Sequence, residues 1–159
     1  MASAFSIEQR RKAIQSRIEA LNHRQYRDVE KFNTALQEIV RLKTEEEALL
    51  IVQKVVADVY ARIIDRTPVD TGRARASWQF GVGVEPKGEV PEGDYKVQLS
   101  AIIAENLDKI EAAPAAVWFI ANHLDYIEAL EAGWSQQAPA GMVGLTIREL
   151  TRQLQGVKI

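Results

Sequence analysis

The residues of this chain that could do chemistry are few and poorly placed for it. The 159-residue sequence has no cysteine and only two histidines, so it cannot assemble a metal cluster of the usual His and Cys type. Asp125, Glu128 and Glu131 place carboxylates on adjacent turns of an expected helix, but a lone acidic face on a short helix is usually solvated. Ser135 has no histidine near it in sequence to activate it. We therefore predict no catalytic residue, no metal ligand, no cofactor and no enzymatic activity.

The composition is that of one ordinary soluble domain. Hydrophobic residues make up 47% of the chain and charged residues 26%. No apolar run approaches the roughly 20 residues needed to span a bilayer, so we expect no membrane contact. The N-terminal stretch "MASAFSIEQRRK" reaches charged residues too soon for a signal peptide, and the lack of cysteine suits a reducing compartment. We expect a soluble protein that is made inside the cell.

Charge is distributed unevenly along the chain. Residues 1–43 carry nine Lys or Arg against five Asp or Glu, whereas residues 44–159 carry eleven against seventeen. Such runs are usually solvated helix faces. The alternative is a basic arm that touches an acidic neighbour or nucleic acid, and the sequence leaves both interpretations open.

The N-terminal part of the chain has the spacing of helices. Apolar stripes in residues 1–43 are interrupted at Gln25 and Asp28, which predicts a break or a change of partner near "LNHRQ", although one long helix remains an alternative. A second helix is predicted from Thr44, which Glu47 can cap reciprocally, to about Arg66. We divide the chain into a helical arm, residues 1–43, and an α+β domain, residues 44–159.

Short strands follow the second helix. "TPVDTGRARASW" forms a rigid joint, because Pro68 ends the helix and Gly72 allows an unusual backbone angle. "WQFGVGV" and "YKVQLS" alternate like an antiparallel pair, and the apolar run "AVWFIAN" suits a third strand. We predict an α+β fold, with an antiparallel or mixed sheet of about three strands packed by a long central helix and a C-terminal helix.

The stretch "DYIEALEAGWSQQAPAGMV" connects two expected helices. Gly133 is placed to close the first helix, and Pro139 is placed to open the second. The connector between them exposes Trp134 beside Gln136 and Gln137. Local chemistry explains its ends but not those exposed side chains.

Two motifs together carry a resemblance to a known family. "RTPVDTGRARASW", followed some fifty residues later by "ANHLDYIEALEAGWSQQAPAGMV", resembles long-tailed bacteriophage neck and tail-completion proteins, including the lambda minor tail protein Z type. The resemblance covers residues 45 to about 155. The positions that carry it are Pro68, Asp70, Thr71, Gly72, Arg73, Trp78, Asn122, Tyr126, Leu130, Glu131, Gly133, Gln137, Pro139, Gly141 and Met142.

The resemblance implies a structural virion protein without catalysis. Such a protein would form or complete a ring of six or twelve copies that joins the tail tube to the head. Its partners would be other copies of itself, head-completion or connector proteins and tail tube or terminator proteins, with passing contact to DNA in the neck lumen. It would be assembled in the bacterial cytoplasm and end in the virion neck or tail. The alternative is a tail terminator that caps the tube and fixes its length, and a more distant one is a small enzyme.

The resemblance also suggests where neighbouring subunits meet. "GWSQQAPAG" is interpreted as a docking element, with a merely structural connector as the alternative. The interface candidates are Arg73, Arg75, Trp78, Tyr126, Glu131, Trp134, Gln136, Gln137, Pro139 and Met142.

Overall fold

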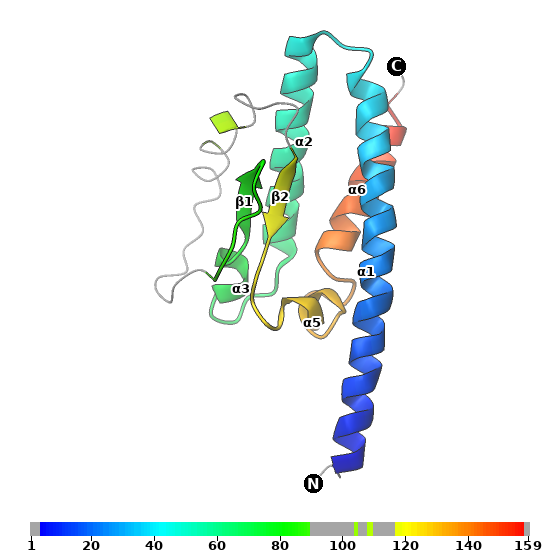
Figure 1. Ribbon diagram of the computed structural model, residues 1–159, viewed down its shortest axis with the longest axis vertical. Coiled ribbons are helices and arrows are strands. Elements are labelled where there is room, and N and C mark those ends of the chain that lie inside the picture. The colour runs from blue at the N-terminus through cyan, green and yellow to red at the C-terminus, as the bar shows by residue number, and fades with distance from the viewer. Residues whose placement is uncertain (1–3, 90–103, 105–107, 110–116, 158–159) are drawn as a thin grey trace.

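A helical hairpin forms the frame of the molecule. The computed structural model describes residues 4–89, 104, 108–109 and 117–157. Helix α1 (Ala4–Val40) and helix α2 (Glu45–Arg66) run in opposite directions, and α1 projects well beyond the rest of the fold at its N-terminal end (Figure 1). The remaining elements are α3 (Arg73–Ala76), β1 (Gln79–Val82), β2 (Trp118–Ala121), α5 (Ile127–Glu131) and α6 (Val143–Gln155).

Helix α1 is continuous from Ala4 to Val40, so a break near Gln25 and Asp28 is wrong and the alternative of one long helix is confirmed. Both residues lie where the helix meets the C-terminal half of the chain. The Gln25 side chain donates a hydrogen bond to the Glu131 carboxylate at 2.9 Å, and the Arg148 guanidinium donates to the Asp28 carboxylate at 3.3 Å. The polar interruptions of the apolar stripe are therefore contacts between helices.

The second half of α1 belongs to the hydrophobic core. Phe32 is 1% exposed and packs in one cluster with Leu36, Val59 of α2 and Ile147 of α6. Most of the close packing of α1 is against α6. The division of the chain at residue 43 stays a prediction, but the residues after about position 32 pack with the domain.

Helix α2 begins and ends as the sequence predicts. Thr44 and Glu47 form a reciprocal capping box, in which the Glu47 amide donates to Thr44 Oγ1 and the Thr44 amide donates to the Glu47 carboxylate. Thr67 has an extended backbone, ψ 126°, as expected for a residue before proline. Five residues on one face of this helix are buried, namely Val56, Val59, Tyr60, Ile63 and Ile64.

The described sheet has two antiparallel strands. Gln79 of β1 lies opposite Ala121 of β2, and Val82 lies opposite Trp118. β2 falls within the apolar run that the sequence assigns to a third strand. The other predicted strand, residues 95–100, lies outside the described residues. The α+β class is confirmed, with long helices and a C-terminal helix packed around a small sheet.

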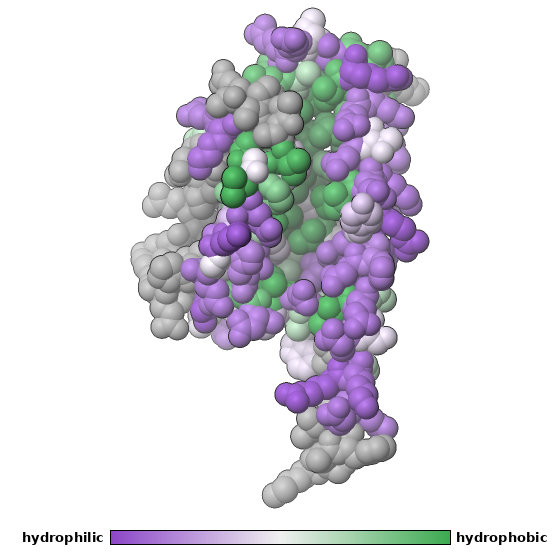
Figure 2. Space-filling model, viewed as in Figure 1, coloured by the Kyte–Doolittle hydropathy of each residue, from purple (hydrophilic) through white to green (hydrophobic). Residues whose placement is uncertain are grey.

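An apolar hollow lies between α1 and the strands. Figure 2 shows hydrophobic residues gathered along it, with polar residues on the outward faces of the helices. Its volume is about 550 Å³, and its lining includes Phe32, Val59, Ile63, Trp118 and Ile120. The Phe32 and Trp118 rings meet edge to face, with their centroids 6.5 Å apart.

Candidate functional site

The two sequence motifs meet at one surface. A cavity of about 340 Å³ lies between the joint after α2 and the short helix α5 with its connector. We call this the motif surface. It is lined by Pro68, Val69, Asp70, Thr71, Gly72, Arg73, Ala74, Tyr126, Leu130, Trp134, Ser135 and Gln137.

A buried set of hydrogen bonds anchors the joint beneath the motif surface. The Trp78 indole N–H donates to Thr67 Oγ1 at 2.8 Å, and that hydroxyl donates to the Ile63 carbonyl at 2.7 Å. The Tyr60 hydroxyl donates to the Trp78 carbonyl at 2.9 Å. Burial raises the pKa of Tyr60 to about 12, because the charged phenolate is disfavoured away from water. Tyr60 therefore remains a hydrogen-bond donor at every physiological pH.

The chain then turns sharply into α3. Gly72 has φ 91°, a left-handed conformation that other residues rarely adopt. The Arg75 guanidinium donates to the carbonyls of Asp65 and Thr67, each at 3.1 Å. The Asn122 amide donates to the Ala74 carbonyl at 2.9 Å. The joint is thus fixed both to the end of α2 and to the segment after β2.

Gln137 joins the second motif to the first. Its side-chain amide accepts a hydrogen bond from the Val69 backbone N–H at 3.0 Å and donates one to the Val69 carbonyl at 3.1 Å. This two-bond arrangement has the pattern of a residue pair in an antiparallel sheet. An interface candidate of the sequence analysis therefore connects the two motifs within one chain.

Glu131 has a similar internal role. Its carboxylate accepts hydrogen bonds from the backbone N–H groups of Met142, Val143 and Gly144 at 2.8 to 2.9 Å, and a fourth from Gln25. These amides form the N-terminus of α6, where a negative charge is also favoured by the helix dipole. A side chain from α5 thus caps α6 across the connector.

The connector closes as predicted at one end and differs at the other. Gly133, with φ 86°, follows the C-cap of α5, and an added Cβ would lie 2.4 Å from the Pro139 carbonyl oxygen. Pro139 does not open α6, which begins at Val143. Gly141, with φ 78°, interrupts the backbone between them, and the Glu131 cap selects the later start.

The exposed candidates lie on or beside the motif surface. Trp134 is 69% exposed and Tyr126 is 43% exposed. Val69, which lines the same cavity, is 40% exposed. Gln136 and Pro139 are also exposed. The predicted exposure of Trp134 is confirmed.

Two other candidates lie mostly inside the fold. In the single chain Trp78 is 7% exposed and Met142 is fully buried, so little of either side chain reaches the surface. Their apolar volume fills the core behind the joint and at the start of α6. Arg73 is half-buried and donates to the exposed Glu89 carboxylate at 2.8 Å, while Arg75 is occupied by the carbonyls described above.

A second polar cluster, which the sequence analysis missed, joins α2 to α6. Arg62 pairs with Asp58 at 2.8 Å and with Glu149 at 3.3 Å, and Arg66 pairs with the same Glu149 carboxylate. The hydrogen bond from Arg66 lowers the pKa of Glu149, and the hydrogen bond to Asp58 raises the pKa of Arg62. Asp58 and Arg62 have helical pairing distance in the sequence, but nothing local indicates Glu149.

The described residues meet the requirements of neither a metal site of three or more side chains nor a membrane-spanning helix. In the described residues, no group of three or more His, Asp or Glu side chains is placed to hold a metal ion. His123 Nε2 lies 2.7 Å from the Pro86 carbonyl oxygen. Among the helices that the structure describes, none is long and apolar enough to cross a membrane.

Comparison with known proteins identifies the family. The family model "Bacteriophage HK97-gp10, putative tail-component" matches residues 30–112, which include the C-terminal end of α1, the whole of α2 and the first motif. The second motif lies beyond the matched residues, and the match does not distinguish a lambda minor tail protein Z type. Searches of curated proteins and of solved structures gave no significant match. The chain belongs to the HK97-gp10-like family of bacteriophage tail components.

Proposed function

We propose that this tail component forms or completes a ring at the phage neck, where the tail tube joins the head. In this role the protein acts by binding its neighbours, and the virion is its final location after assembly in the host cytoplasm. The partners are further copies of the chain, six or twelve in the ring, together with head-completion or connector proteins and tail tube or terminator proteins. Packaged DNA passes through the lumen of such a ring.

The observation that carries the proposal is the exposed aromatic pair on the motif surface. Trp134 and Tyr126 present large side chains to solvent from a connector that Glu131 and Gln137 hold in place. Exposed aromatic residues on a rigid support lose little conformational entropy on binding, and they are the side chains that dominate interface energies. A merely structural connector would have its tryptophan buried.

Truncation of Trp134 tests the docking role directly. Trp134→Ala is expected to change the free energy of unfolding by less than about 0.5 kcal/mol, because the side chain is 69% exposed. It is expected to weaken assembly by about 2 kcal/mol, roughly thirtyfold in the binding constant. Leu50→Ala is the matched control, since Leu50 is 60% exposed on α2 outside the motif surface. Normal joining of heads and tails by Trp134→Ala would contradict the docking role.

Electron microscopy of particles made without this protein tests the role in joining. Filled heads without tails, beside finished free tails, are the expected result. Abnormally long tails would show instead that the protein terminates the tail tube.

A further inference from the structure

The N-terminal half of α1 lies outside the core that the rest of the fold forms. Of the described side chains on α1, the first fully buried one is Phe32, and Gln25 is hydrogen-bonded to Glu131 of α5. Residues 4–24 form a helical extension, which we call the arm helix, with a length of about 30 Å. Figure 1 shows that it projects from the end of the molecule where α3 and α5 lie.

The arm helix has the composition of a docking helix. It carries five Lys or Arg against two Glu. Its apolar residues Ile7, Ile14, Ile18 and Leu21 recur at spacings of seven, four and three, the spacing of one helix face. The same face becomes core farther along α1, at Phe32 and Leu36. The apolar stripe of the arm helix therefore continues, beyond the body of the fold, the face of α1 that packs in the core.

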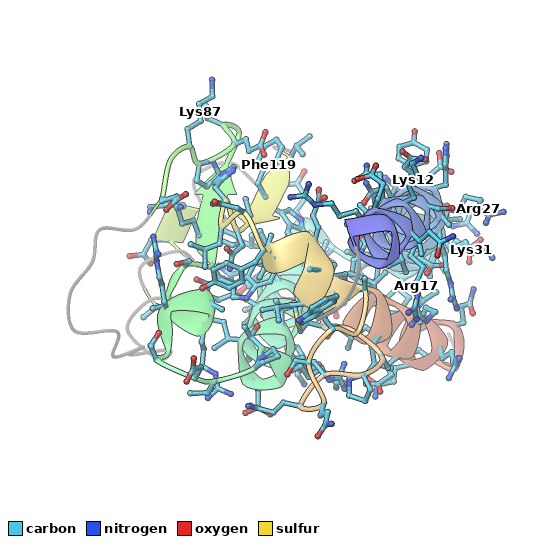
Figure 3. The ribbon with its side chains drawn as sticks, turned by 90° about the horizontal axis from the view of Figure 1, so that it is seen from below. Lys12, Arg17, Arg27, Lys31, Lys87 and Phe119 are labelled. Atoms are coloured by element: carbon cyan, nitrogen blue, oxygen red, sulfur yellow. The ribbon has the colours of Figure 1, made fainter. Side chains whose placement is uncertain are left out.

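Three cations of the arm helix have no partner among the described residues, whereas Arg24 pairs with Asp28 at 3.9 Å. Arg11, Lys12 and Arg17 are exposed, and none of them makes an ion pair with the described residues. Figure 3, which views the molecule from this end, shows Lys12 and Arg17 extending from α1 into solvent, together with Arg27 and Lys31.

The end of the body beside the arm helix has the opposite character. Asp125 and Glu128 are exposed on the segment that forms α5, and Asp70 is exposed on the edge of the motif surface. In the part of the chain that the structure describes, these three carboxylates make no ion pair. Asp70 lines the motif surface together with Tyr126 and Trp134, and Asp125 and Glu128 lie within two positions of Tyr126 in the chain. We call this region, residues 68–74 and 125–137, the acidic end face.

We propose that the arm helix of one copy docks on the acidic end face of another copy, with its apolar stripe against Trp134 and Tyr126 and its cations near Asp70, Asp125 and Glu128. The two surfaces are complementary in charge. Each also has apolar residues that are not fully buried in the single chain, namely Ile18 and Leu21 on the arm helix and Tyr126 and Trp134 on the acidic end face. An amphipathic helix laid on an apolar surface with a charged rim is a common recognition mode. This contact rests on the proposed function, because it supplies the link between copies that a ring requires.

The absence of cysteine makes a clean crosslinking test possible. Ser16→Cys places a thiol on the exposed arm helix, and Gln136→Cys places one on the exposed connector, in a chain with no other thiol. The two full-length variants are mixed and treated with a short bismaleimide. We expect a linked dimer that contains one chain of each variant. Products that link only position 16 to position 16, or no product, would overturn the docking proposal.

Charge reversal tests the electrostatic part of the contact. Arg17→Glu and Glu128→Arg should each reduce the yield of the mixed dimer about tenfold, and combining the two should restore it. Lys43→Glu is the control, because it makes the same charge change in an exposed position away from the arm helix. Denaturant midpoints of each variant confirm that folding is retained. Equal loss in the Lys43→Glu control, or no recovery in the combined variant, would overturn the proposal.

The same cysteine variants distinguish a failure of the docking contact from a failure of the proposed ring. A chain that carries both Ser16→Cys and Gln136→Cys forms a ladder of linked trimers and larger species if each copy docks on a different neighbour. A product that stops at a doubly linked dimer supports the docking contact but contradicts the ring. A failure to link in the mixture, with Trp134→Ala still blocking assembly, leaves the proposed ring intact and removes the arm helix from its interface.

Discussion

Removal of the Glu131 carboxylate is expected to destabilise the protein through α6. Glu131→Ala leaves three backbone N–H groups at the start of α6 without their acceptor and frees the Gln25 amide. Loss of one side-chain cap costs about 0.5–2 kcal/mol, and a hydrogen bond to a charged group contributes about 1.5–3 kcal/mol. These contributions are not additive, and water replaces part of them at a half-buried site. We expect the free energy of unfolding to fall by about 3 kcal/mol.

Chemical denaturation of the wild-type chain and variants measures this change. For a chain of this size about 3 kcal/mol corresponds to a fall of roughly 6–12 °C in Tm. Glu131→Gln keeps one acceptor oxygen but removes the charge, so it should lose about half as much. Glu128→Ala is the matched control, because it removes an exposed carboxylate from the same helix and should cost less than about 0.5 kcal/mol.

Amide exchange locates the effect. In Glu131→Ala, the amides of Met142, Val143 and Gly144 should lose protection before those in the middle of α6. Equal stability of Glu131→Ala and Glu128→Ala would refute the capping role of Glu131, whatever the exchange pattern.

Three further predictions concern the joint and its link to the connector. Thr67→Val removes the buried acceptor of the Trp78 indole N–H and should cost about 2–3 kcal/mol in denaturant unfolding, and a change below 1 kcal/mol would count against it. The pKa of Tyr60 is raised to about 12 in the folded chain, against 10 when unfolded. Its contribution to the free energy of unfolding is therefore fully present below pH 10 and is lost as pH rises toward 12. The loss should be roughly 3 kcal/mol, and it should be absent in Tyr60→Phe. Gln137→Ala removes both bonds to Val69 and should cost about 1–2 kcal/mol, with faster amide exchange at Val69 as the direct readout.

Local signals in the sequence predict the elements well. The capping box of Thr44 and Glu47 fixes the start of α2, and Pro68 fixes its end. Gly133 closes α5, and Trp134 is exposed as expected. Each of these features depends on residues a few positions apart, where backbone geometry and side-chain reach are nearly independent of the rest of the fold.

Distant contacts are the part that sequence patterns could not supply. Gln25 interrupts an apolar stripe and resembles a break, because its partner Glu131 lies 106 residues away in the chain. For the same reason, the sequence does not indicate that Glu131 and Gln137, two interface candidates, hydrogen-bond backbone groups elsewhere in the same chain. Pro139 has the chemistry of a first helical residue, but the position of the Glu131 carboxylate decides where α6 begins. A polar residue that satisfies a distant backbone is indistinguishable from an exposed one in a single sequence.

The two polar contacts at the middle of α1 also determine the direction in which its N-terminal half points. Gln25 binds Glu131 and Asp28 binds Arg148, so the helix is fixed to α5 and α6 just where it leaves the body. A segment of about 30 Å beyond that point acts as a lever, and a change of about 5° at its base moves its tip by roughly 3 Å. A closed ring of six copies turns by about 60° from each subunit to the next, so small angular errors accumulate around it. Substitution of Gln25 or Asp28 would then alter the curvature of an assembly, and with it the number of copies that close, more than the strength of any single contact.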